Sequence, residues 1–428
     1  MGKKQTWDVL VVGGGPAGML AAVAAGRCGA RTALLEKNSR LGRKLAITGG
    51  GRCNLTNSAP GEEFIKNIPG NGKLLFSALS RFSSRDCRAF FSRLGVETVE
   101  EDQGRVFPRE GRADVVVEAL ERHLEALGVS IFYSLKVEEL LLEGGRCLGV
   151  VTARGRVFQA KTVVVAAGGA SYPATGSSGD GYPLAARAGH TVKPPLPGLV
   201  PLRFADSRIG RDLQGLSLQE AVLTLTGAGG KKQAVERGEV IFTHFGLSGP
   251  AALKISRYVS LLSASGEGGL RLLVDTLPDS GEDDLAARLL AAASDQPRKT
   301  VVNLVRQIVP ERLAQVVAGM IPEDAVKKSA GAGRETWRQV SRLIKGLALE
   351  LAGTRPLAEA MVTVGGVSTG EVDPRTMSSR LVGGLYFAGE VLDIDAYTGG
   401  FNIQAAFSSG WLAGASAAEY SSGRRPAD

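Results

Sequence analysis

The sequence predicts an α/β fold that is discontinuous along the chain, with two further regions inserted into it. Three observations predict this fold. A strand, a glycine-rich turn, a helix and a second strand follow one another in residues 8–36. A buried strand and a helix of small residues occur at 385–410, and the residues between change to short strands and then to helices. At 428 residues the chain is long enough for two or three domains.

The first 36 residues have the pattern of a dinucleotide-binding unit. Asp8–Val12 is a short apolar run rich in β-branched residues, as expected for a strand buried on both faces. The turn and helix start that follow contain Gly13, Gly15, Ala17 and Gly18. At this spacing the first glycine makes the tight turn, the second lets the backbone reach a pyrophosphate, and the third lets the helix approach the strand. Glu36 ends the next strand, where an acid accepts hydrogen bonds from a ribose hydroxyl and disfavours a 2′-phosphate.

A second glycine-rich loop follows at residues 42–57, with the sequence GRKLAITGGGRCNLTN. Three consecutive glycines favour neither helix nor strand, so they indicate a backbone that passes close to a flat or charged ligand. The basic residues around them would neutralise phosphates or an anionic cofactor, and the alternative is a solvated surface loop. A buried, inert thiol is favoured over a catalytic one for the cysteine of this loop. The candidate cofactor residues of this region are Lys37, Arg43, Lys44, Arg52, Cys53 and Asn54.

Two later segments return to the same predicted sheet. Residues 162–167 form an apolar run that ends in Gly168, at the carboxyl edge where ligands bind in open α/β sheets. Residues 385–388 predict a short buried strand that leads into Glu390. After two glycines, a helix of small residues begins near Asn402. The pattern therefore predicts one ligand site built from both ends of the chain.

These motifs resemble a family of bacterial FAD-dependent oxidoreductases described as aminoacetone-oxidase-like or 3-dehydro-bile-acid Δ4,6-reductase-like. The resemblance covers nearly the whole chain. It is carried by GRKLAITGGGRCNLTN, by Arg105-Val-Phe-Pro-Arg, and by the segments 171–182, 242–250 and 384–410. It implies a Rossmann-like FAD-binding domain of the glutathione-reductase type, within the two-dinucleotide-binding-domain flavoproteins.

The resemblance also implies roles for individual residues. The strand that carries Val137 would offer its backbone to adenine, and Gly168 would lie beside the cofactor. The Gly-Glu pair ending at Glu390 resembles a Gly-Asp motif that holds the ribityl chain or a phosphate, with a longer acid in place of aspartate. The backbone N–H groups of Asn402 and Ile403 would meet the N1–C2=O edge of the flavin, where the helix dipole stabilises negative charge.

The inserted regions divide the chain into four predicted segments. These are residues 1–193 and 354–428 for the FAD-binding domain, 194–280 for a β-rich, barrel-like domain, and 281–353 for a small helical domain. A hairpin is predicted from 221 through 233, and its glycines are not a nucleotide loop because no helix pattern follows. A dedicated NAD(P)H domain is not expected, since only one strand–GxGxxG–helix unit occurs, although a nicotinamide could visit the flavin transiently.

Composition restricts the class of protein further. The four cysteines, Cys28, Cys53, Cys87 and Cys147, include no C-x-x-C pair, which argues against disulfides and a zinc site and favours a reducing, cytoplasmic location. No metal is expected, and no apolar stretch reaches the roughly 18 residues of a membrane span. Lys3 and Lys4 imitate a secretion signal, but Asp8 and Pro16 interrupt the apolar run.

The net charge of +8 is modest, so nucleic acid is not expected as a partner. The helical insert is basic, but the solvated side of a small bundle explains this better than an acidic-partner face. Its basic residues are Arg298, Lys299, Arg306, Arg312, Lys327, Lys328, Arg334, Arg338, Arg342 and Lys345.

The sequence thus predicts an FAD-dependent oxidoreductase that transfers hydride between FAD and a small organic substrate. An NAD(P)H-linked reductase that saturates a conjugated C=C bond is favoured. The alternatives are an oxygen-using amine oxidase and a flavin-dependent RNA-binding or redox-sensor protein. Hydride transfer needs no obligatory acid–base triad. Candidates for orienting substrate or moving a proton, each with an equally good structural explanation, are Tyr172, Tyr182, His244, Asp395 and Tyr397.

Overall fold

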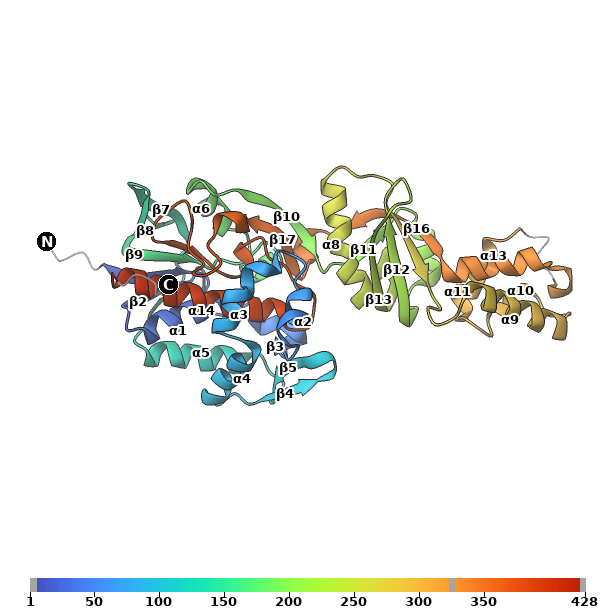
Figure 1. Cartoon of the computed structure of the whole chain (residues 1–428), viewed down its shortest axis with the longest axis horizontal. Helices are drawn as coiled ribbons and strands as arrows, with labels where there is room; N and C mark the ends of the chain where they lie inside the picture. Colours follow the sequence, from blue (N-terminus) through green and yellow to red (C-terminus); the bar gives the residue numbers. More distant parts are fainter. Residues whose placement is uncertain (1–5, 323–327, 424–428) are drawn as a thin grey trace. The chain divides into compact units, whose positions relative to one another are not determined.

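The computed structural model describes residues 6–322 and 328–423. It divides into two compact units, which are described separately (Figure 1). The first unit comprises Met1–Leu196 and Met361–Asp428, and the second comprises Pro197–Ala360. Lys3, Lys4 and Lys327 lie outside the described residues.

A seven-stranded sheet forms the centre of the first unit. Its strand order is β6 (Ser130–Phe132), β2 (Thr32–Leu35), β1 (Trp7–Val12), β9 (Val157–Val165), β8 (Arg146–Thr152) and β7 (Val137–Glu143), with β18 (Leu385–Phe387) also paired to β9. The strands β6, β2, β1, β9 and β18 are parallel, whereas β7, β8 and β9 form an antiparallel meander. Parallel strands buried on both faces need helices on each side, and this arrangement confirms the predicted Rossmann-like α/β fold.

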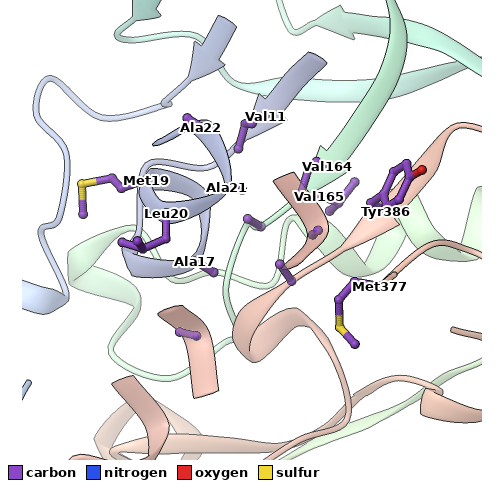
Figure 2. Packing of buried hydrophobic residues seen from close by; sticks show 14 of the residues in the cluster. Val11, Ala17, Met19, Leu20, Ala21, Ala22, Val164, Val165, Met377 and Tyr386 are labelled. Carbon is purple, nitrogen blue, oxygen red and sulfur yellow. The ribbon is translucent and has the colours of Figure 1, made fainter. Parts of the chain in front are cut away.

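Two helices of small residues pack against each other beside this sheet. They are α1 (Pro16–Arg27) and α14 (Phe401–Ser421). A Cβ atom added to Gly410 would lie 2.1 Å from the carbonyl oxygen of Ala17, and one added to Gly414 would lie 2.0 Å from that of Ala21. The helices therefore touch through their backbones, which is why both are rich in alanine and glycine. Figure 2 shows Ala17, Leu20 and Ala21 of α1 in the core with Val164 and Val165 of β9.

Smaller elements complete the first unit. A three-stranded antiparallel sheet has the order β3 (Thr56–Asn57), β5 (Arg105–Pro108) and β4 (Thr98–Glu101), and β10 (Val192–Gly198) pairs with β17 (Val362–Val367). The remaining helices are α2 (Gly61–Lys66), α3 (Phe76–Arg81), α4 (Ser84–Arg93), α5 (Asp114–Ala126) and α6 (Gly181–Arg187).

The second unit is a closed barrel with helices. Its strands are ordered β11 (Leu202–Phe204), β14 (Gly246–Ser248), β13 (Lys232–Thr243), β12 (Ser217–Thr226), β15 (Arg271–Asp275) and β16 (Leu347–Thr354), and β16 closes on β11. The predicted hairpin is confirmed as β12 and β13. The helices among its described residues are α7 (Ser207–Leu213), α8 (Pro250–Ala264), α9 (Glu282–Asp295), α10 (Val301–Val305), α11 (Glu311–Gly319) and α13 (Arg334–Lys345). Trp337 of α13 and Leu289 of α9 share one apolar core with Leu272 and Leu349 of the barrel.

Two elements of this unit differ from the sequence prediction. The helix α8 lies in the region predicted to contain only short strands; Pro250 is at its first turn, and Ala251, Ile255 and Val259 are buried at helical spacing. The strand β16 ends the region predicted to be helical. Buried Leu347 and Leu349 alternate in it with exposed neighbours. This alternation with a period of two residues is typical of a strand, and it marks the end of the helical region. No helix among the described residues is long and apolar enough to cross a membrane.

Candidate cofactor-binding site

The first glycine turn connects β1 to α1. Gly13 has a φ of +103°, and a Cβ atom there would lie 2.6 Å from the carbonyl oxygen of Ala166. A Cβ atom on Gly18 would lie 1.8 Å from the carbonyl oxygen of Gly13, whereas one on Gly15 would meet no atom within 4 Å. Two of these glycines are thus required by the fold itself. Gly15, the N-cap of α1, leaves open space in front of a helix N-terminus, which suits a phosphate.

Glu36 connects this turn to the end of β2. Its carboxylate accepts hydrogen bonds from the backbone N–H of Gly14 at 2.7 Å and from the backbone and side-chain N–H groups of Asn38 at 2.7 and 2.6 Å. The side chain is buried in this position. Glu36 therefore orients the glycine turn in this structure, and its contact with a ribose stays a prediction.

The second glycine loop has a backbone that only glycine adopts readily. Gly49, Gly50 and Gly51 have φ angles of +58°, +68° and +87°. Cβ atoms on Gly50 and Gly51 would meet nothing within 4 Å, so this side of the loop is open. On the other side, a Cβ atom on Gly49 would lie 3.1 Å from the ring of Phe107. The loop thus presents open backbone on one side and packs against the three-stranded sheet on the other.

The four predicted cations all have partners within the first unit. Lys37 pairs with Asp180 and donates to Ser178. Arg43 donates to Asn38 at 2.9 Å and to the carbonyl oxygen of Ala174 at 3.0 Å. These contacts bring residues 37–43 to the 171–182 segment, so that two motifs far apart in the sequence form one surface.

Lys44 forms the most buried contact of this group. Its Nζ donates to Glu390 Oε2 and to Ser171 Oγ, both at 2.7 Å. Glu390 also accepts from Ser171 Oγ at 3.1 Å and from the backbone N–H of Thr363 at 2.8 Å. The structure therefore joins the second glycine loop to the segment after β18, as a single site requires.

The start of α14 contacts the same loop. Gly400 is its N-cap with a φ of +95°, and the first helical bond runs from Gln404 N–H to the carbonyl oxygen of Gly400. With its amide oriented to satisfy its neighbours, Asn54 accepts from the N–H of Gly400 at 3.0 Å. The N–H groups of Asn402 and Ile403 precede the first helical bond, as expected of a positive helix end. The Asn402 side chain bonds both backbone groups of Ala396 and so fixes the preceding turn.

Three further residues predicted to bind the cofactor, Val137, Gly168 and Cys53, lie on different elements of the first unit. Val137 is buried at the start of β7, and Gly168 follows β9 with a φ of +75°. Cys53 is buried, and burial raises the pKa of its thiol to about 12, against a smaller lowering by a hydrogen bond from Thr48. A thiol with this pKa is protonated at neutral pH and a poor nucleophile. Among the described residues, no cluster of His, Cys, Asp and Glu could hold a metal ion.

The candidate catalytic residues lie on several different elements. His244 is exposed in the turn between β13 and β14 of the second unit, where its ring contacts Phe245. Tyr172 is half-buried with a φ of +53°, and burial raises the pKa of Tyr182. Asp395 and Tyr397 share one turn, which is held to the 67–70 segment by two backbone hydrogen bonds, Gly70 N–H to Asp395 O at 3.1 Å and Tyr397 N–H to Asn67 O at 2.9 Å.

Sequence reasoning missed the partners that fix the site residues. These are Asn38, Ser171, Asp180 and Thr363. Ser171 and Asp180 lie in the 171–182 motif, but their partners are more than 100 residues away. No local pattern predicts such pairs.

Comparison with known proteins finds relatives along nearly the whole chain. The family model described as "HI0933-like protein Rossmann domain" matches residues 7–416. The chain is 32% identical over 422 residues to a 3-dehydro-bile acid delta(4,6)-reductase of Clostridium scindens, covering 96% of this chain and 98% of the relative. It is 33% identical over 414 residues to a ribosomal RNA dihydrouridine synthase of Escherichia coli, covering 95% and 97%.

A solved structure shows the same fold. A 3-ketosteroid delta1-dehydrogenase from Sterolibacterium denitrificans superposes with a TM-score of 0.52 at 14% identity, covering 97% of this chain and all of that one. The fold and these relatives define the class, and the chain is an FAD-dependent oxidoreductase. More narrowly, it belongs to the HI0933-like family, which confirms the resemblance carried by its motifs.

Proposed function

We propose that this protein is an NAD(P)H-linked, FAD-dependent reductase that saturates a C=C bond conjugated to a carbonyl group. One observation carries the proposal. Two kinds of relative, each covering more than nine-tenths of the chain, have different substrates but related chemistry. A delta(4,6)-reductase of a 3-dehydro-bile acid saturates a C=C bond conjugated to a ketone, and a dihydrouridine synthase saturates the ring C=C bond beside a uracil carbonyl.

The residues of the first unit fit an FAD molecule. The open space at Gly15 and the N-terminus of α1 would hold the pyrophosphate, and the open side of Gly50 and Gly51 would accept the flat ring. FAD, when bound, supplies the hydride chemistry. The chain contributes the positive end of α14, held against the glycine loop by Asn54, which favours negative charge on a nearby ring or substrate.

The test begins with the purified protein. We expect a flavin absorption spectrum, release of FAD on denaturation, and anaerobic consumption of NAD(P)H when a cyclic enone is added. Peroxide formed in proportion to an added amine would instead establish the amine oxidase alternative. Absence of flavin even after FAD is added would refute both enzymes.

A second candidate substrate is a uridine within RNA. Two relatives carry the name ribosomal RNA dihydrouridine synthase. In the second unit, the N–H of Ser329 donates to the carbonyl oxygen of Lys299 at 2.8 Å, which places Lys328 beside Lys299 and Arg298 on an exposed surface. If RNA is the substrate, RNA binding weakens steeply with salt, and charge reversal at these three residues lowers RNA turnover while turnover of a free enone is unchanged.

A further inference from the structure

The Arg105-Val-Phe-Pro-Arg motif contains β5, the central strand of the three-stranded sheet. Its buried Phe107 supports the second glycine loop. The guanidinium carbon of Arg52 lies 4.2 Å from the centre of the Phe107 ring. Glu101 of the neighbouring strand β4 accepts hydrogen bonds from both terminal nitrogens of the same guanidinium. Arg52 is thus held by an aromatic ring and by a carboxylate.

The position of Arg52 favours a ligand other than the pyrophosphate. Arg52 directly follows the open positions Gly50 and Gly51, and Asn54, two residues further, contacts the start of α14. The other glycine turn, at the N-terminus of α1, is the one that suits a phosphate. A guanidinium has five N–H donors, of which two are used by Glu101, so three remain for a ligand.

The combined charge of Arg52 and Glu101 also favours a ligand other than the pyrophosphate. The Arg52 hydrogen bond lowers the pKa of Glu101, so the carboxylate is ionised at neutral pH and offsets the charge of the guanidinium. A neutralised arginine is poorly suited to a permanent dianion. It is better suited to a neutral oxygen that becomes negative during a reaction, because Glu101 and Phe107 hold its donors in one orientation before the charge develops.

We propose that Arg52 binds the carbonyl oxygen of the substrate and that Glu101 and Phe107 position it. The inference rests on the proposed reductase function. In that reaction the β-carbon gains a C–H bond by addition of a hydride whose two electrons come from NAD(P)H; FAD, when bound, would supply this hydride chemistry. The electron pair of the C=C bond moves to form an enolate, whose oxygen Arg52 binds. A proton from water then adds to the α-carbon.

The experiment uses the oxidised, FAD-loaded protein without turnover. The probe is 4-chlorophenol, a planar oxyanion when ionised, whose stacking on an oxidised flavin is followed by long-wavelength charge-transfer absorption. The variants are Arg52→Met, Glu101→Gln and the matched control Glu100→Gln. Glu100 is the preceding residue of β4 and pairs with Arg88 at 3.0 Å. FAD content and thermal unfolding are compared for all variants.

The account predicts that wild type binds the phenolate and that Arg52→Met weakens binding by about 100-fold, as loss of an oxyanion donor does. Glu101→Gln should weaken phenolate binding about threefold, because Arg52 loses the carboxylate that orients it, and for the same reason it should lower kcat for enone reduction with little change in KM. Glu100→Gln should change neither.

Absence of phenolate binding in wild type, equal binding by Arg52→Met, or equal effects of Glu100→Gln and Glu101→Gln would each overturn the inference. Failure of the proposed function is a different result. It would appear as a wild-type protein that binds phenolate through Arg52 yet does not reduce any enone with NAD(P)H.

Discussion

Lys44 Nζ lies 2.7 Å from Glu390 Oε2, although the two residues are 346 positions apart in the chain. Each side chain is only about one-fifth exposed, so the ion pair is shielded from water. It joins the second glycine loop to the segment after β18. The candidate cofactor site is therefore assembled from both ends of the chain.

Replacing Glu390 with alanine should weaken FAD binding about tenfold, because the change removes the ion-pair partner of Lys44 and the acceptor of the Thr363 N–H. Titration of the apoprotein with FAD, followed by flavin fluorescence, measures this. The control is Glu359→Ala, which breaks the exposed pair with Arg355 in the second unit and should leave FAD affinity unchanged. Unchanged FAD affinity in Glu390→Ala would contradict the assignment of Lys44 and Glu390 to the FAD site.

The two glycines Gly15 and Gly18 should respond differently to alanine. Gly18→Ala places a Cβ atom 1.8 Å from a backbone oxygen and should destabilise the protein by more than about 3 kcal/mol. Gly15→Ala fills open space, so the apoprotein should unfold at the wild-type temperature while FAD binding falls at least tenfold. Differential scanning fluorimetry and FAD titration separate the two effects. A Gly15→Ala protein that binds FAD normally would show that no phosphate lies there.

The cysteines should differ in reactivity. Cys28 is exposed, whereas Cys53, Cys87 and Cys147 are buried with pKa values raised by burial. Burial also raises the pKa of Cys28, so its alkylation should accelerate as pH rises from 7 to 9. Mass spectrometry of the native protein should find one modified thiol, and four after unfolding. Cys53→Ala should retain enone reduction. If a folded, FAD-loaded Cys53→Ala protein lost turnover, Cys53 would have to be a catalytic residue.

Stability should fall as pH drops from about 7 to 5. Burial lowers the pKa of His190, so the folded state binds fewer protons than the unfolded state between the two pKa values. Stability is therefore present above the unfolded pKa and is lost as pH falls toward the folded one. His123, whose pKa burial also lowers, acts in the same direction. The unfolding temperature of His190→Gln should change less with pH across this range than that of wild type. An identical dependence on pH would show that His190 does not contribute to the loss of stability.

The sequence predicted the first unit well because its signals are local. The strand Trp7–Val12, the helix Pro16–Arg27 and the strand Thr32–Leu35 each have a regular pattern, and the glycines between them have distinct steric roles. The closure of the barrel by β16 on β11 and the contact of Lys44 with Glu390 were not predictable in this way. Both depend on segments distant in sequence, and no periodicity within either segment identifies its partner.

The most direct test of the central claim is a single-turnover experiment without oxygen. The FAD-loaded protein is reduced with one equivalent of NAD(P)H and mixed with a cyclic enone, while flavin absorption and product are followed. The account predicts that NAD(P)H bleaches the flavin and that the enone restores its absorption with one equivalent of saturated product. A flavin that NAD(P)H does not bleach, or that only oxygen reoxidises with formation of peroxide, would contradict it.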